Sequence, residues 1–180
     1  MAEQPKNAPV SDASPAPSHR AAGPASVRCA VLTVSDTRTP DTDRSGQTIK
    51  DLLSEHGHAV AGYEIVPDEP DAIRRLLDQW IADPNIAAIL SNGGTGIARR
   101  DTTYDVINGL LEKRLDGFGE LFRALSFAEI GSAAMMSRAV AGSRQGTFIV
   151  AMPGSTNAVR LAMEKLVLPE LSHVVYELSK

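Results

Sequence analysis

The chain has 180 residues, of which 43% are hydrophobic and 22% charged, and its formal net charge is −4. These proportions are typical of a globular protein, and the length predicts one compact domain. A mildly acidic chain lacks the basic face that general nucleic-acid binding requires, so we expect no nucleic-acid partner. The single cysteine, Cys29, excludes a disulfide framework and a cysteine-based zinc or iron–sulfur site. No apolar run reaches the roughly 18 residues of a membrane span and no secretory signal precedes the domain, which favours the cytoplasm and no membrane partner.

The N-terminal part of the chain differs in composition from the rest. Residues 1–26 are rich in alanine, proline and serine and hold almost no bulky apolar side chains, which predicts a disordered tail. Residues 27–180 are expected to form the domain. It begins with a near-continuous apolar run at residues 27–35, which is typical of a strand buried on both faces.

Helical and extended patterns then alternate. Ser45 is expected to cap a helix that ends at Gly57, and residues 58–66 read as a second strand. Asp68 precedes the clearest amphipathic helix, and residues 86–90 form a short apolar run typical of a buried strand.

The second half of the chain continues this alternation. Helices are expected from Thr102 and from Gly117, and residues 139–142 and 147–150 predict a hairpin. Ser155 is expected to cap a further helix, and a last helix contains Leu171, Val174, Val175 and Leu178. The predicted fold is α/β, a three-layer α/β/α arrangement with a mostly parallel sheet plus a hairpin.

Four polar or glycine-containing segments follow the predicted strands. In open α/β sheets, ligands bind outside the carboxyl ends of the strands, so we expect these segments to meet at one edge. They are residues 35–36, 67–68, 91–101 and 153–155.

The third segment contains Gly93, Gly94, Thr95 and Gly96. Glycine tolerates positive φ and lets a ligand approach the backbone, so this loop could hold phosphate on its N–H groups. A tight turn without a ligand is the alternative. The loop matches neither the P-loop nor the G-x-G-x-x-G fingerprint, so a dinucleotide-dependent oxidoreductase has no direct support.

Charged side chains accompany the glycine loop. Asp68 and Asp101 both precede predicted helices, where aspartate is a preferred N-cap; alternatively they bind Mg²⁺ together with substrate phosphates. Arg99 and Arg100 could clamp phosphate, although neighbouring residues on an extended loop point apart and at most one would face the ligand.

Several short motifs occur in order between Val27 and the C-terminus. Together with the glycine loop and its Ala98-Arg99-Arg100-Asp101 ending, they resemble the molybdenum cofactor biosynthesis proteins of the MoaB/Mog type. The motifs are Val34-Ser35-Asp36, Asp43-Arg44-Ser45-Gly46, Pro67-Asp68-Glu69, Gly117-Phe118-Gly119-Glu120, Ser137-Arg138-Ala139 and Met152-Pro153-Gly154-Ser155.

The resemblance implies a molybdopterin-binding domain that forms a homotrimer or homohexamer. Active members of the family adenylylate molybdopterin with Mg-ATP, release pyrophosphate, and pass the product to a molybdate-inserting enzyme. Asp68 and Asp101 match the family's essential carboxylates and would be the catalytic and Mg²⁺-binding residues. Some relatives without these acids bind but do not catalyse.

Combined with the resemblance, the residue patterns assign substrate contacts to the polar turns. The expected substrate-binding residues are Ser35, Ser45, Gly93, Gly94, Thr95, Gly96, Arg100, Glu120, Pro153, Gly154 and Ser155. The leading hypothesis is an adenylyltransferase. The alternative is a carrier or scaffold that binds molybdopterin without catalysis.

Overall fold

The structure is a computed structural model, and it describes residues 23–180. Most of the predicted tail, residues 1–26, lies outside the described residues. The strands are β1 (Arg28–Val34), β2 (Ala59–Val66), β3 (Ala88–Asn92), β4 (Lys113–Arg114), β5 (Val140–Arg144) and β6 (Thr147–Met152). The α-helices are α2 (Arg44–Glu55), α3 (Pro70–Ile81), α4 (Thr103–Leu110), α5 (Asp116–Ile130), α6 (Thr156–Ala162) and α7 (Leu168–Leu178). A 3₁₀ segment, η1 (Gly131–Met136), follows α5, and a π-helical segment, η2 (Met163–Val167), joins α6 to α7.

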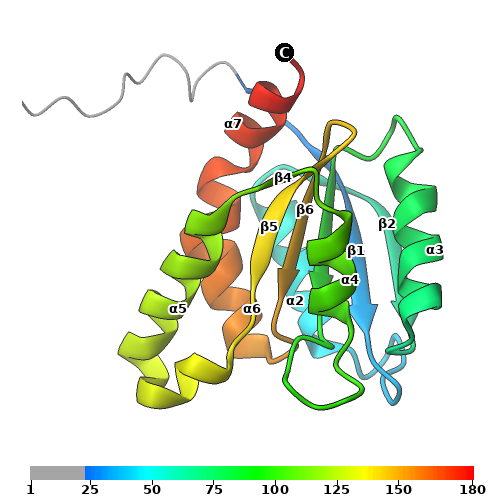
Figure 1. Cartoon of the computed structure of the whole chain (residues 1–180). Coiled ribbons are helices and arrows are strands. Elements are labelled where there is room, and N and C mark those ends of the chain that lie inside the picture. The colour runs from blue at the N-terminus through cyan, green and yellow to red at the C-terminus, as the bar shows by residue number, and fades with distance from the viewer. Residues whose placement is uncertain (1–22) are drawn as a thin grey trace, which may run out of the picture.

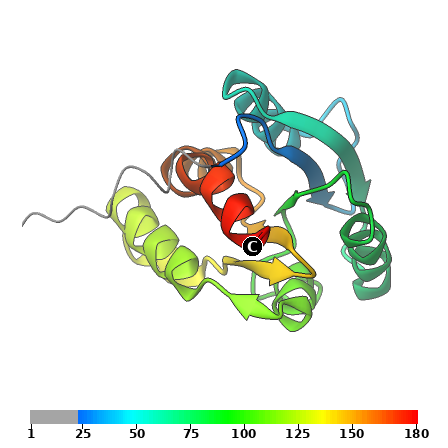
Figure 2. The same cartoon turned by 90° about the horizontal axis from the view of Figure 1, so that it is seen from above.

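The strands form one mixed sheet in the order β2-β1-β3-β6-β5-β4. Strands β2, β1, β3 and β6 are parallel neighbours, whereas β5 and β4 extend the sheet in antiparallel fashion. This confirms the predicted α/β fold, with α2, α5, α6 and α7 on one face of the sheet and α3 and α4 on the other (Figures 1 and 2). Within residues 23–180, no helix is both long and apolar enough to cross a membrane.

The central strands bury both of their faces, as the apolar run at residues 27–35 predicted. Cys29 and Val31 pack in the core on the α2 side, while Ala30, Leu32 and Val34 pack on the α3 side. Successive side chains of a strand point to opposite faces, so a fully apolar strand serves two cores. Cys29 is inert there, because burial raises the pKa of its thiol to about 12.

Three local predictions were wrong in detail. The N-cap of α2 is Asp43, which accepts a hydrogen bond from the Gly46 N–H at 2.9 Å, and not Ser45. Strand β3 lies two residues further along the chain than predicted, because its backbone pairs with β1 and β6 as far as Asn92. The hairpin turn is only Gln145-Gly146, both at positive φ, because β5 continues to Arg144.

Asp43 is a buried carboxylate, 2% exposed, that ties α2 to two strands. Besides the Gly46 N–H, it accepts hydrogen bonds from the Thr33 hydroxyl at 2.6 Å and the Tyr63 hydroxyl at 2.8 Å. Burial and the bond to Asp43 raise the pKa of Tyr63 well above its ordinary value. The network fixes the first turn of α2 against the carboxyl ends of β1 and β2.

The Asp43→Ala variant should lower the free energy of unfolding by about 3 kcal/mol, because it removes a helix cap and the acceptor of the buried Thr33 hydroxyl and the half-buried Tyr63 hydroxyl. Urea denaturation followed by circular dichroism measures this change. Asp51→Ala is the matched control, because Asp51 is an exposed carboxylate of the same helix whose one side-chain hydrogen bond among residues 23–180 comes from Gln47. Equal stability of the two variants would contradict the role given to Asp43.

Candidate functional site

The four segments predicted to meet do lie at one edge of the sheet, because they follow the parallel neighbours β1, β2, β3 and β6. The backbones there touch directly. A Cβ on Gly93 would overlap the carbonyl oxygen of Val34, and a Cβ on Gly154 would lie 2.9 Å from the Cα of Gly93. Gly93 also donates its N–H to the carbonyl of Met152 at 3.2 Å. Glycine at 93 and 154 therefore allows β1, β3 and β6 to end against one another.

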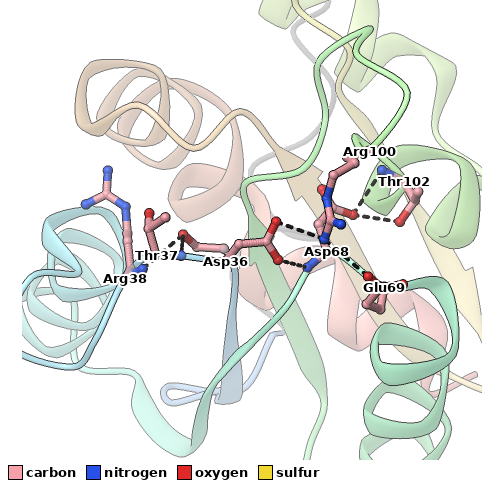
Figure 3. Close-up of polar contacts among 8 residues, drawn as sticks. Asp36, Thr37, Arg38, Asp68, Glu69, Arg100 and Thr102 are labelled. Carbon is pink, nitrogen blue, oxygen red and sulfur yellow. Dashed lines mark hydrogen bonds and ion pairs between the residues drawn. The ribbon is translucent and has the colours of Figure 1, made fainter.

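Asp68 is not a helix cap, although its position before α3 allowed that interpretation. The N-cap of α3 is Glu69, and the side chain of Asp68 turns instead toward the glycine loop. Its Oδ1 accepts hydrogen bonds from the N–H of Thr102 at 3.0 Å and the Thr102 hydroxyl at 2.6 Å (Figure 3). Its Oδ2 lies so close to Gly94 that a Cβ there would overlap it. The carboxylate is 8% exposed and links the end of β2 to both ends of the loop.

Asp101 also faces the glycine loop and does not cap α4. The N-cap of α4 is Thr102, whereas Asp101 accepts the N–H of Ala98 on its Oδ2 at 2.8 Å and donates its own N–H to the Ala98 carbonyl at 2.9 Å. A Cβ on Gly96 would lie 2.5 Å from the same Oδ2. Both predicted carboxylates thus border the loop, Asp68 at Gly94 and Asp101 at Gly96.

The loop presents unused backbone donors. Among residues 23–180, the N–H groups of Gly94, Thr95, Gly96 and Ile97 have no protein acceptor. Unpaired N–H groups in succession on a turn form a concave site that suits an anion. The carbonyls of the same stretch are used, since Gly94 accepts from Thr103 at 3.0 Å, and Thr95 and Gly96 accept from Arg138 at 3.0 and 2.6 Å.

Arg100 binds carboxylates in this structure. Its Nη2 lies 3.0 Å from Asp36 and 3.2 Å from Glu69, and Asp36 in turn accepts the N–H of Asp68 at 3.2 Å (Figure 3). Arg99 is exposed and makes no such pair within the described part of the chain. The two adjacent arginines therefore have different surroundings, and that one of them faces a bound phosphate stays a prediction.

The other predicted contacts fall into two groups. Ser35, Ser45 and Ser155 stabilise the turns: Ser35 accepts from the N–H groups of Thr37 and Arg38, Ser45 donates to the Gly154 carbonyl at 2.6 Å, and Ser155 caps α6. Glu120 is not brought to the loop: it lies exposed on α5, and within the described residues it makes no hydrogen bond or ion pair with the loop.

Two clefts open at this edge of the sheet, one bordering the glycine loop and one bordering the turn after β6. One, of about 480 Å³, is lined by residues that include Arg74, Arg99, Asp101 and Arg138. The other, of about 380 Å³, is lined by Pro153, Ser155 and residues from α5 and α6. One cleft therefore lies against Ile97 and Asp101 of the loop, and the other lies against the turn that follows β6.

Three residues of this edge were not among the predicted contacts, namely Asp36, Asp43 and Arg138. Each lies in a motif that carries the resemblance, and Asp36 also lies in the first of the four polar segments expected at this edge. Their partners come from distant segments: Arg138 bonds to residues 42 and 43 positions earlier in the chain.

Comparison with known proteins agrees with this geometry. The family model described as "probable molybdopterin binding domain" matches residues 30–173. The molybdenum cofactor biosynthesis protein B of Halalkalibacterium halodurans is 54% identical over 163 residues, which cover 90% of this chain and 96% of that protein. A crystal structure of a molybdenum cofactor biosynthesis protein B superposes with a TM-score of 0.84 at 49% identity, covering 86% of this chain and 96% of that one. The tungsten cofactor synthesizing protein MoaB from Pyrococcus furiosus superposes with a TM-score of 0.78 at 34% identity, covering 87% and 99%.

A side chain at Gly94 should damage the loop. Gly94 has φ of +62°, and a Cβ there would overlap Asp68 and the Thr103 hydroxyl, so Gly94→Ala should lower the free energy of unfolding by about 1–3 kcal/mol. Gly109→Ala, in α4 where a Cβ meets nothing within 4 Å, should instead raise it by about 0.5 kcal/mol. Chemical denaturation measures both changes. An unchanged free energy of unfolding in Gly94→Ala would contradict the close contact of Gly94 with Asp68 and Thr103.

Proposed function

This chain belongs to the MoaB/Mog family of molybdenum cofactor biosynthesis proteins, and we propose that it adenylylates molybdopterin with Mg-ATP and releases pyrophosphate. The observation that carries the proposal is the combination, on one loop, of unpaired N–H groups at residues 94–97 with the carboxylates of Asp68 and Asp101. The product would pass to a molybdate-inserting enzyme.

The proposed reaction requires no protein nucleophile. A terminal phosphate oxygen of molybdopterin forms a bond to the α-phosphorus of ATP, the bond from that phosphorus to the bridging oxygen breaks, and pyrophosphate leaves. The protein's task is to hold two anions in line and to stabilise the charge that develops on the transferred group. The N–H groups of Thr95, Gly96 and Ile97 can donate to phosphate oxygens without further rearrangement of protein hydrogen bonds.

The carboxylates fit a magnesium ion that arrives with ATP. Oδ2 of Asp68 and Oδ1 of Asp101 accept no hydrogen bond from residues 23–180, so each aspartate has an oxygen to offer. No group of three or more histidine, cysteine, aspartate or glutamate side chains in those residues could hold a metal by itself. Mg²⁺ characteristically binds one or two carboxylates plus substrate phosphates, and when bound it neutralises phosphate charge.

Asp101→Asn should lower the turnover number about 100-fold or more, a loss typical when one electrostatic group is removed from an active site. An asparagine oxygen can still accept the Ala98 N–H, so the loop should keep its shape and the protein its stability. Pyrophosphate release from molybdopterin and Mg-ATP measures the rate, with Asp51→Asn on α2 as the matched control. Unchanged turnover in Asp101→Asn would refute the catalytic role.

The same assay separates the enzyme from the alternative, a non-catalytic carrier. A carrier shares the loop and the clefts but transfers no group. Saturable molybdopterin binding by the wild-type protein without any pyrophosphate release would favour it. The retention of both Asp68 and Asp101 favours the enzyme.

We also propose that the protein forms a homotrimer or homohexamer through α5 and η1. Large apolar side chains are exposed along this part of the chain, and Phe127 is 63% exposed. Several large exposed apolar side chains gathered on one segment are typical of a protein contact. The exposed apolar residues of this segment are Leu115, Leu121, Phe127, Ile130, Met135 and Met136.

Phe127→Glu should reduce the molar mass in solution toward that of one chain, 19.1 kDa, because the contact would bury an unpaired carboxylate. Light scattering after size-exclusion chromatography measures the mass. Val60→Glu, which changes an exposed apolar residue of the edge strand β2, is the control and should keep the wild-type mass. A monomeric wild-type protein, or an unchanged mass in Phe127→Glu, would contradict this interface.

A further inference from the structure

Arg138 forms an ion pair with Asp105 and, in addition, three hydrogen bonds to carbonyls of the glycine loop and its end. It stands between η1 and β5, and its side chain is 26% exposed. Its Nε donates to the Thr95 carbonyl at 3.0 Å, and its Nη2 donates to the carbonyls of Gly96 at 2.6 Å and Asp101 at 3.0 Å. One guanidinium group thus binds the loop at its middle and at its end.

The guanidinium is itself held in place from the first turn of α4. Its Nη1 lies 3.1 Å from both carboxylate oxygens of Asp105, and its Cζ lies 4.7 Å from the centre of the Tyr104 ring. An ion pair and a stacked aromatic ring together fix the plane of the group. The loop carbonyls therefore bond to a donor whose orientation is already set.

These bonds decide which way the N–H groups of the loop point. In a trans peptide, the carbonyl of one residue and the N–H of the next point in opposite directions. With the carbonyls of Thr95 and Gly96 turned to Arg138, the N–H groups of Gly96 and Ile97 point away from it. The Gly94 carbonyl bonds to the Thr103 N–H in the same turn of α4, so the N–H of Thr95 also points away from α4.

We propose that Arg138 is a positioning residue that shapes the loop into an anion-binding cradle. This inference rests on the proposed function for the nature of the anion, a phosphate group of a substrate. Arg138 does not contact the anion in this scheme. It acts through the Thr95, Gly96 and Asp101 carbonyls, and through Asp101 it also sets the backbone beside a proposed catalytic carboxylate.

Lysine cannot replace arginine in this role. Three separate nitrogens of Arg138 reach partners on the loop and on α4, and a single ammonium nitrogen cannot occupy all three positions. A lysine keeps the positive charge, so Arg138→Lys separates the geometry of the fork from the charge. Arg144→Lys is the matched control, because Arg144 lies at the far end of β5 and donates to the Leu110 carbonyl, away from the loop.

The test uses the full chain and inorganic pyrophosphate as the probe. Two-dimensional ¹⁵N–¹H NMR of the wild-type protein should show saturable shifts of the Thr95, Gly96 and Ile97 amides as pyrophosphate is added. In Arg138→Lys these amides should already be displaced without ligand, and the dissociation constant should rise about tenfold or more, since misplaced binding groups lose much of their effect. Arg144→Lys should match the wild type in both respects.

The outcomes separate this inference from its alternatives. A purely structural role would lower the melting temperature of Arg138→Lys while leaving the amide shifts and pyrophosphate affinity of the folded protein unchanged, and that result would overturn the proposal. Absence of saturable shifts at these amides in the wild type would overturn it as well. If the wild type binds pyrophosphate at these amides, Arg138→Lys loses that binding, and no adenylylation occurs, the role of Arg138 stands and the enzymatic function fails.

Discussion

The close approach of three backbones at the carboxyl edge of the sheet is the constraint on which the site depends. A Cβ on Gly93 would overlap the Val34 carbonyl oxygen, and a Cβ on Gly154 would press against the backbone of Gly93. The chain turns at this point, with Gly93 and Gly94 both at positive φ, and the N–H groups of residues 94–97 are left without acceptors among residues 23–180. The loop proposed to bind phosphate thus begins where β1, β3 and β6 end against one another.

Charge at this edge is balanced locally. Asp68 is nearly buried but keeps hydrogen bonds from Thr102, which compensates for the loss of water around its carboxylate. Asp36 and Glu69 lie near it on the surface and pair with Arg100. Substrate phosphates would enter a region that already contains several carboxylates, in a chain whose net charge is −4. In the proposed chemistry, their negative charge would therefore be compensated by local groups, namely the unpaired N–H groups and a divalent cation.

One continuous segment links the exposed apolar surface to the loop. Helix α5 and η1 carry the apolar side chains proposed for assembly, and Arg138 follows them directly before β5 begins. Segment η1 ends at Met136, so Arg138, the proposed positioning residue, lies two positions after it. In the proposed scheme, the surface for assembly and the residue that positions the loop therefore belong to adjacent parts of the chain.

The sequence by itself determined the α/β class, the α-helices and every strand except β4 to within a few residues, and the set of turns that meet at one edge. Apolar periodicity and glycine placement are local properties, and the rule that parallel strands share a carboxyl edge converts them into a location. The sequence also singled out Asp68 and Asp101 but left open whether they cap helices. Only the tertiary structure decided that question. In the sequence, an aspartate before a helix is compatible with both roles, and the contacts of Asp68 with Thr102 and Gly94 depend on how distant segments pack. The tertiary structure likewise excluded Glu120 from the loop and brought in Arg138, since their surroundings depend on strand order and on contacts between residues far apart in the chain.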